Sequence, residues 1–322
     1  MSAELMRIAM VGAEDLQARS MFEVLKEGGY APAQIAPLAG TLGALEISLA
    51  DDDTAEVLLP LTHELVEGTQ VVALFSADPQ ARSEVHRWAA EGGQFLFDLA
   101  PVWGECSRLV DPLAVGEGGH PSGECLIPDP GALYLARLLG HLGALAEGPL
   151  WVQALLPASR FGEQGVRELF AQATSIMTFK PLPTEFLGRQ TAFNCWPLDQ
   201  TGASEGFANQ VRTLSRKPDL KVAWSAVQSG LFHCTAVSAV VGTGASSGTA
   251  EALTAAIEAD DVFGLWDGEG WPSPVDLAGQ LKPVACCRML DDETLFIWLV
   301  FDNAKAGKGA LAGRMILGGG AG

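Results

Sequence analysis

A short apolar run that ends in glycine opens the chain and limits the folds open to it. Met6-Arg-Ile-Ala-Met-Val-Gly12 has the composition of a strand that is buried on both faces of a parallel sheet. Helical spacing of apolar residues follows from Leu16 to Leu25, and Gly28-Gly29 ends it. A strand, a glycine and a helix in this order are typical of the first unit of a doubly wound α/β sheet.

Strand–helix–strand alternation continues through the N-terminal part of the chain. We expect a strand at 71–76, a polar helix that ends at about residue 90, and a second strand at 94–98. Residues 102–126 hold many glycines, prolines and acidic residues, so they are expected to form a loop. The alternation predicts a Rossmann-like, doubly wound parallel sheet with right-handed crossovers.

The rest of the chain mixes helical and strand patterns, which predicts a second domain of α+β class with a mixed sheet. The expected segments are a helix at 131–144, a strand at 150–156, a helix at 163–174, strands at 222–228 and 235–241, a helix at 248–258, strands at 283–289 and 295–301, and a flexible tail at 318–322.

Composition and charge exclude some classes of function and indicate the cellular compartment. The formal net charge of −19 argues against nucleic acid and anionic membrane as partners, because both repel a polyanion. No run approaches about 18 uninterrupted apolar residues, and no secretory signal is recognisable. The six cysteines lack the spacing of a zinc site or a disulfide framework. We therefore expect a cytoplasmic protein with free thiols, no membrane contact and no metal site.

Only part of a dinucleotide-binding loop follows the first strand. Such loops use glycines so that amides at a helix N-terminus can approach the pyrophosphate. Here Gly12 and Ala13 are retained, whereas Asp15 and Ala18 stand at the later glycine positions. Glu14 and Asp15 would place two negative charges beside the phosphates, although acidic residues also stabilise the first turn of a helix. The loop that contains Glu14 and Asp15 therefore either caps the helix or binds a cofactor, and its two negative charges favour capping.

Four later segments stand out as motifs in a fixed order. They are Ile127-Pro-Asp-Pro-Gly-Ala-Leu133, Gln190-Thr-Ala-Phe-Asn-Cys-Trp-Pro197, Trp271-Pro-Ser-Pro-Val-Asp-Leu-Ala-Gly279 and Leu295-Phe-Ile-Trp-Leu-Val-Phe-Asp-Asn303, with Phe75-Ser-Ala77 and Asp98 nearer the N-terminus. In order and spacing they resemble the segments Asn-Pro-Asn-Cys-Ser-Thr, Ile-Ala-Phe-Asn-Val-Ile-Pro, Tyr-Pro-Thr-Pro-x-Asp-Val-Ala-Gly and Leu-Trp-Val-Val-x-Asp-Asn of the aspartate-semialdehyde dehydrogenase family. Together they cover nearly the whole chain.

The resemblance implies a fold, an activity and an assembly. Members of the family reduce aspartyl phosphate to the semialdehyde with NADPH through a thioacyl enzyme, a step of amino-acid biosynthesis, and form homodimers through the second domain. The first domain is then expected at 1–128, joined by a C-terminal helix at about 306–322, and the substrate and dimerisation domain at 129–305. The implied NADP-binding positions are Gly12, Ala13, Ser76 and Ala77.

Position by position, the resemblance leaves the active site incomplete. Ala132 stands at the position of the nucleophile, whereas His233 matches the histidine acid/base and Gln153 matches a glutamine near the thiol. The positions of a carboxylate-binding arginine, a phosphate-binding arginine and a lysine hold Ala226, Gly104 and Gly206. Reduction through a thioacyl enzyme needs a thiolate, and alanine supplies none.

The losses fit a cysteine-less subgroup of the family, the Usg proteins, as does Pro157-Ala-Ser-Arg-Phe-Gly-Glu-Gln-Gly165. We expect a non-catalytic dimer that binds a metabolite or another protein. The alternative is an active NADP-dependent dehydrogenase that uses a displaced thiol such as Cys234, although neighbours in a strand point to opposite faces. A scaffold that binds no small molecule is the third hypothesis.

Overall fold

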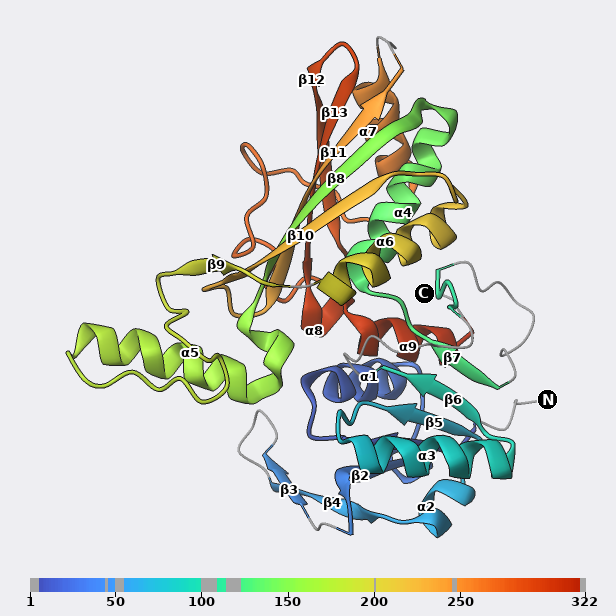
Figure 1. Cartoon of the computed structure of the whole chain (residues 1–322). Coiled ribbons are helices and arrows are strands. Elements are labelled where there is room, and N and C mark those ends of the chain that lie inside the picture. Colours follow the sequence, from blue (N-terminus) through green and yellow to red (C-terminus); the bar gives the residue numbers. More distant parts are fainter. Residues whose placement is uncertain are drawn as a thin grey trace. The chain divides into compact units, whose positions relative to one another are not determined.

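The computed structural model describes residues 6–43, 46–49, 55–99, 109–113, 123–199, 201–244 and 248–318. The chain forms two compact units (Figure 1). The first comprises Met1–Pro128 and Lys308–Gly322, and the second comprises Asp129–Gly307. No helix in the described ranges is both long enough and apolar enough to cross a membrane.

The first unit is built on one sheet with the strand order β3-β4-β2-β1-β5-β6-β7. The strands are β1 (Ile8–Val11), β2 (Ile35–Leu42), β3 (Glu46–Leu49), β4 (Ala55–Leu61), β5 (Val71–Leu74), β6 (Phe95–Asp98) and β7 (Glu124–Leu126). All neighbours pair in parallel except β3, which is antiparallel to β4. Every residue of β1, β5 and β6 is buried, as expected for central strands covered on both faces. The predicted doubly wound sheet is confirmed.

Helices of the first unit begin and end at residues suited to those positions. They are α1 (Leu16–Glu27), η1 (Pro32–Gln34), α2 (His63–Glu67), α3 (Pro79–Gly92) and α9 (Lys308–Ile316). Asp78 caps α3 through the amide of Ala81, Pro79 fills its first position, and Gly93 ends it in the left-handed region at φ 68°. The last helix, α9, packs on α1 through Gly309, whose amide donates to the Gln17 side chain.

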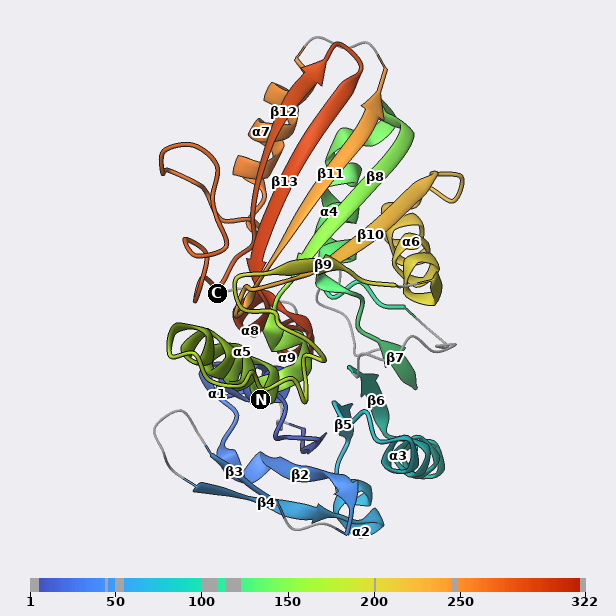
Figure 2. The same ribbon diagram turned by 60° about the vertical axis from the view of Figure 1, so that its left-hand side comes forward.

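The second unit is built on a mixed sheet with the order β12-β13-β11-β8-β10-β9. The strands are β8 (Ala146–Leu156), β9 (Cys195–Pro197), β10 (Val222–Ser229), β11 (Cys234–Thr243), β12 (Val284–Asp291) and β13 (Thr294–Asp302). The helices are α4 (Pro130–Leu142), η2 (Gly143–Leu145), η3 (Ala158–Phe161), α5 (Gly162–Met177), α6 (Thr201–Ser215), α7 (Thr249–Ala259) and α8 (Asn303–Ala306). Figure 2 shows α4, α6 and α7 along one face of this sheet. The expected α+β domain with a mixed sheet is confirmed.

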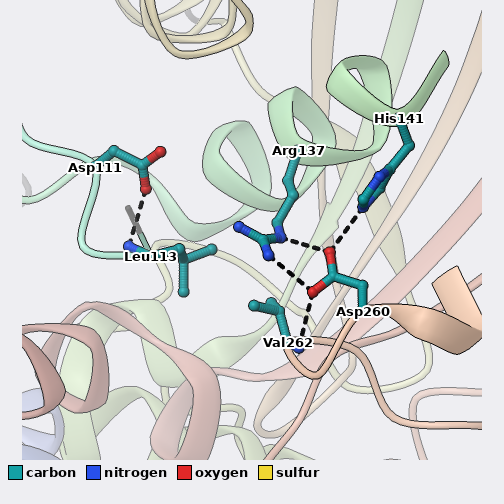
Figure 3. Close-up of polar contacts among 6 residues, drawn as sticks. All are labelled: Asp111, Leu113, Arg137, His141, Asp260 and Val262. Atoms are coloured by element: carbon teal, nitrogen blue, oxygen red, sulfur yellow. Dashed lines mark hydrogen bonds and ion pairs between the residues drawn. The ribbon is translucent and has the colours of Figure 1, made fainter. Parts of the chain in front are cut away.

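A buried carboxylate joins α4 to the end of α7 (Figure 3). Asp260 accepts hydrogen bonds from Arg137 at 2.5 and 2.9 Å, and one of its oxygens lies 2.7 Å from Nε2 of His141. The backbone amide of Val262 donates to the same carboxylate at 3.1 Å. Because the Asp260 side chain is only 2% exposed, these partners replace water and fix the helix pair.

Several segments differ from the sequence-based expectations, and β2, β3, β4, α2 and β9 were not predicted. β7 lies inside the stretch 102–126 that was expected to be a loop, and three residues are too few to show a period. α6 was not predicted, because its glycines lower helix propensity, yet Phe207 and Val211 bury its apolar side. The helix expected at about 306–322 is interrupted at Gly307, which separates α8 from α9. Residues 319–322 of the expected tail lie outside the described ranges.

Candidate functional site

The first turn of α4 contains the predicted nucleophile position. Asp129 is the N-cap, and its carboxylate accepts from the amides of Gly131 at 2.9 Å and Ala132 at 3.3 Å. The amide of Asp129 donates to Gln210 on α6 at 2.7 Å, so the turn is also fixed from outside. Ala132 is fully buried. From Pro130 to Leu133 no side chain carries a sulfur or an oxygen, so no shift of register within this turn supplies a nucleophile.

His233 lies in the turn between β10 and β11. Its carbonyl oxygen accepts from the amide of Asn303 at 3.2 Å and from the hydroxyl of Ser159 at 3.4 Å. Its ring atom Nδ1 is buried and has no hydrogen-bond partner among the described residues. The backbone is therefore held firmly, while the ring keeps an unused polar atom that a bound molecule could satisfy.

Gln153 lies on β8 and faces away from the nucleophile position. In the sheet register Gln153 pairs with Ser225 on β10 and with Ser238 on β11, so these three side chains lie on the same face of the sheet. Successive residues of a strand point to opposite faces. Val237 belongs to the other face, where its side chain lies 3.5 Å from the place of a Cβ on Gly131. Gln153 is exposed, so the structure does not bring it beside Ala132.

The lost anion-binding positions fall in different surroundings. Ala226 is buried on β10 and pairs with Ala154, which leaves its methyl group where the resemblance requires a guanidinium. Gly206 lies in α6, and Gly104 lies outside the described residues. Neither described position supplies the charge-assisted hydrogen bonds with which arginine and lysine hold carboxylates and phosphates.

Cys234 is not placed as a substitute nucleophile. Its side chain is 3% exposed and packs with Ala236, Leu277, Val284 and Val300. Burial, with a smaller effect of the Asp302 carboxylate, raises the pKa of Cys234 to about 12. At neutral pH it is therefore a thiol, which is a poor nucleophile compared with a thiolate.

The loop after β1 is packed tightly against two other strands. Gly12 has φ 83°, and a Cβ there would lie 2.7 Å from the Ser76 amide, so only glycine fits. Ser76 donates from its hydroxyl to the carbonyl of Gly40 at 2.6 Å. A Cβ on Gly40 would lie 2.3 Å from a carboxylate oxygen of Glu14. The Glu14 side chain thus lies over the carboxyl end of β2, where doubly wound sheets receive nucleotide ribose.

Asp15, the second acidic residue of this loop, is a helix cap. Its carboxylate accepts from the amide of Gln17 at 2.7 Å, as the capping interpretation predicted. Burial raises its pKa, and the Gln17 hydrogen bond opposes that rise. The predicted cofactor positions Gly12, Ala13 and Ser76 are buried here, and Ala77 is exposed.

Two named relatives align with nearly the whole chain. No family model matches the chain. A USG-1 protein homolog of Azotobacter vinelandii is 26% identical over 321 residues, which cover 93% of this chain and 93% of that protein. Aspartate-semialdehyde dehydrogenase 2 of Vibrio cholerae is 24% identical over 325 residues, with 93% of each chain covered.

These relatives support membership of the chain in the aspartate-semialdehyde dehydrogenase family.

Solved structures from the family share its fold. Aspartate semialdehyde dehydrogenase II from Vibrio cholerae, complexed with ASA, superposes with a TM-score of 0.82 at 20% identity and covers 97% of each chain. Aspartate semialdehyde dehydrogenase with NADP from Candida albicans superposes with a TM-score of 0.68 at 12% identity and covers 97% of each chain. The two-unit architecture is therefore that of the aspartate-semialdehyde dehydrogenases.

The family motifs that remain hold loops in place rather than present reactive groups. Asp302 caps α8 through the amide of Ala304 at 2.7 Å and accepts from the amide of Gly279 at 2.6 Å. Asn303 accepts from the hydroxyl of Thr235 at 3.0 Å. Sequence comparison identified these segments but not their role, which depends on contacts between residues far apart in the chain. The Asp302-Asn303 pair, where β13 meets α8, was the available signal.

Proposed function

We propose that this protein is a non-catalytic binding member of the aspartate-semialdehyde dehydrogenase family. The observation that carries the proposal is the first turn of α4, Pro130–Leu133, in which no side chain can attack a carbonyl carbon. Loss of a nucleophile from a cooperative catalytic group costs on the order of 10⁶ in rate. Ala226 at the carboxylate-binding position weakens binding of the family's substrate as well.

The first unit is proposed to have lost high-affinity binding of NADP. A dinucleotide brings phosphates to the helix N-terminus after β1, where Asp15 already caps α1. The Glu14 carboxylate, against Gly40, adds a negative charge at the end of β2. Repulsion there acts most strongly on NADP, since its 2′-phosphate is attached to the ribose that this strand end receives.

The second unit is proposed to form a homodimer through the sheet face opposite α4. Two rows of neighbouring side chains cross this face, and only one of the residues in them is charged. The rows are Cys286-Trp298-Ser238-Gln153-Ser225 and Arg288-Phe296-Val240-Trp151-Ala223. Trp151 is 52% exposed. An aromatic side chain in an almost uncharged face is typical of the centre of a protein interface.

An active NADP-dependent semialdehyde dehydrogenase is the second candidate, and one observation favours it. Nδ1 of His233 is buried without a partner among the described residues, which is costly unless a bound molecule uses it. Such a molecule could be a carbonyl substrate or the ligand of a binding protein.

For either candidate we propose a reducing, cytoplasmic location, because all five cysteines in the described ranges are free.

Thermal unfolding with NADPH, NADH, aspartate semialdehyde and inorganic phosphate tests the proposal. A ligand at 100 times its Kd stabilises the folded state by about 2.7 kcal/mol, which is readily measured as a rise in Tm. We expect no rise with NADPH, whereas a catalytically active family member should respond. A rise with NADPH would refute the proposed loss of the cofactor site.

Restoring the thiol tests the loss of catalysis separately. We expect no NADPH-dependent reduction of aspartyl phosphate by wild type or by Ala132→Cys, because the substrate-binding arginine position is still Ala226. Pro130→Cys places a thiol elsewhere in the same turn, to cover a shift of register, and should be inactive for the same reason. The matched comparison for each cysteine variant is the same variant combined with Ala226→Arg, which restores the substrate-binding arginine as well as the thiol. Turnover by wild type would establish the second candidate, and turnover by a single cysteine variant would show that the remaining site is intact.

A further inference from the structure

Three side chains from separate elements of the first unit converge beside its sheet. They are His86 on α3, Asp98 at the end of β6 and Glu124 at the start of β7. One possible ligand atom from each lies within 4.8 Å of those from the other two. Nε2 of His86 is 3.7 Å from a carboxylate oxygen of Asp98, and Nδ1 is 3.3 Å from one of Glu124.

The backbone explains why these residues meet. In the parallel register of β6 and β7, Glu124 stands beside Leu96, so Glu124 and Asp98 lie on the same face of the sheet. Leu96 packs with Val85 and other side chains of α3, which places that helix over this face. His86 follows Val85 on α3 and points to the margin of the contact, where its side chain is 29% exposed.

Arg82, one helical turn before His86, orients one of the carboxylates. Its guanidinium donates to both oxygens of Asp98, at 3.0 and 2.7 Å. Each carboxylate oxygen has two lone pairs, so an oxygen that accepts from Arg82 can also contact a second partner. With a neutral imidazole, the two carboxylates and one guanidinium carry a net charge of about −1. A cation is therefore attracted to the cluster, and Arg82 holds Asp98 ready for it.

We propose that His86, Asp98 and Glu124 form a binding site for a divalent transition-metal cation of the Zn²⁺ type. One imidazole nitrogen and two carboxylate oxygens are ligands that Zn²⁺ accepts at about 2.0–2.2 Å, with water in the fourth position. Two such bonds at a tetrahedral angle place their ligand atoms about 3.3 Å apart. A metal takes only one of the two ring nitrogens, so the relevant limit is 4.8 Å between ligand atoms, and these atoms must approach by up to about 1.5 Å to close around a cation.

Accessibility fits this assignment. The Asp98 side chain is 8% exposed, whereas those of His86 and Glu124 are 29% and 33% exposed. A buried carboxylate fixed by Arg82 supplies a rigid ligand, and the two outer ligands leave a path for a hydrated ion. Arg82 acts here as a positioning residue, because guanidinium cannot itself bind a cation.

Titration of the metal-free full chain with Zn²⁺ and Co²⁺ at about pH 8, where ordinary imidazole is neutral, tests the site. We expect one high-affinity site by calorimetry, and Co²⁺ absorption bands of a four-coordinate complex. His86→Gln and Glu124→Gln should each weaken binding about 100-fold or more, because each removes a ligand. His63→Gln, in the same unit but beside Trp88 at 5.5 Å, is the matched control and should bind as wild type does.

The simpler reading is an ion-pair network in which a protonated His86 bridges two carboxylates. Wild type that gives no cobalt bands would establish that reading and overturn the metal site. Unchanged affinity in both His86→Gln and Glu124→Gln would place the bound metal elsewhere and overturn it too. Glu124→Gln keeps the size and shape of a one-third exposed side chain, so it tests the site even if His86→Gln fails to fold.

Discussion

At the scale of single residues, Asp260 links a local charge to the stability of the second unit. Burial alone raises its pKa, but hydrogen bonds from Arg137 and His141 outweigh burial and lower the pKa of Asp260 to about 2 from 3.8. A carboxyl group with a depressed pKa stabilises the fold fully above the unfolded value of 3.8. That stabilisation is lost as the pH falls through about 2.

We predict an acid-dependent difference between wild type and Asp260→Asn. At neutral pH the variant should be less stable by about 3 kcal/mol, because Arg137 loses a buried partner. Between about pH 4 and pH 2 the difference should shrink by about 2 kcal/mol, since wild-type Asp260 then becomes protonated. Urea unfolding across this range measures both quantities. Asp261→Asn, at the exposed neighbouring residue, should behave as wild type. A difference that stays constant with pH would contradict the assignment.

At the scale of elements, the contact of α9 with α1 depends on the absence of a side chain. A Cβ on Gly309 would lie 1.8 Å from the Gln17 carbonyl oxygen, and one on Gly313 would lie 2.9 Å from the Val24 side chain. Backbone atoms cannot yield as a flexible side chain does. The last helix therefore joins the first unit only because two glycines on one face of it allow this approach.

Gly309→Ala should separate the two helices and destabilise the protein by about 2–3 kcal/mol. The matched control is Gly140→Ala on α4, where a Cβ meets nothing within 4 Å. That substitution should be neutral or stabilising by up to about 1 kcal/mol, because alanine favours helix over glycine. Chemical unfolding of the two variants gives the comparison. Equal stabilities would mean that α1 and α9 adjust without cost.

The sequence predicts elements whose local composition determines them, and it misses those that depend on contacts with distant residues. β1 and β5 are apolar throughout and buried throughout, so composition alone identifies them. β2 contains Pro37 and Gly40, which normally interrupt a strand, and it is stabilised by pairing with β1. In the candidate site, motif order located Ala132 and His233 but could not locate the His86 cluster. That cluster depends on the register of β6 with β7, which no local pattern encodes.

At the scale of the whole molecule, charge limits how copies can associate. A formal charge of −19 on each chain repels a second copy, and salt screens this repulsion. The proposed dimer face carries little of this charge, because Arg288 is the only charged residue in its two rows. The Arg288 guanidinium lies 5.7 Å from the Trp271 ring. Burial of Trp151 and Phe296 then contributes apolar area with little desolvation of charge.

We therefore predict a dimer whose affinity rises with salt and depends on Trp151. Trp151→Glu should shift the protein to monomer in light scattering, because it buries a carboxylate without a partner and removes an aromatic contact. Val57→Glu, at a residue of the first unit that is 56% exposed, adds the same charge elsewhere and should leave the dimer intact. If both variants dissociate alike, net repulsion rather than this face governs assembly. If wild type is monomeric at high salt, the sheet face is not a self-association surface and another partner must cover it.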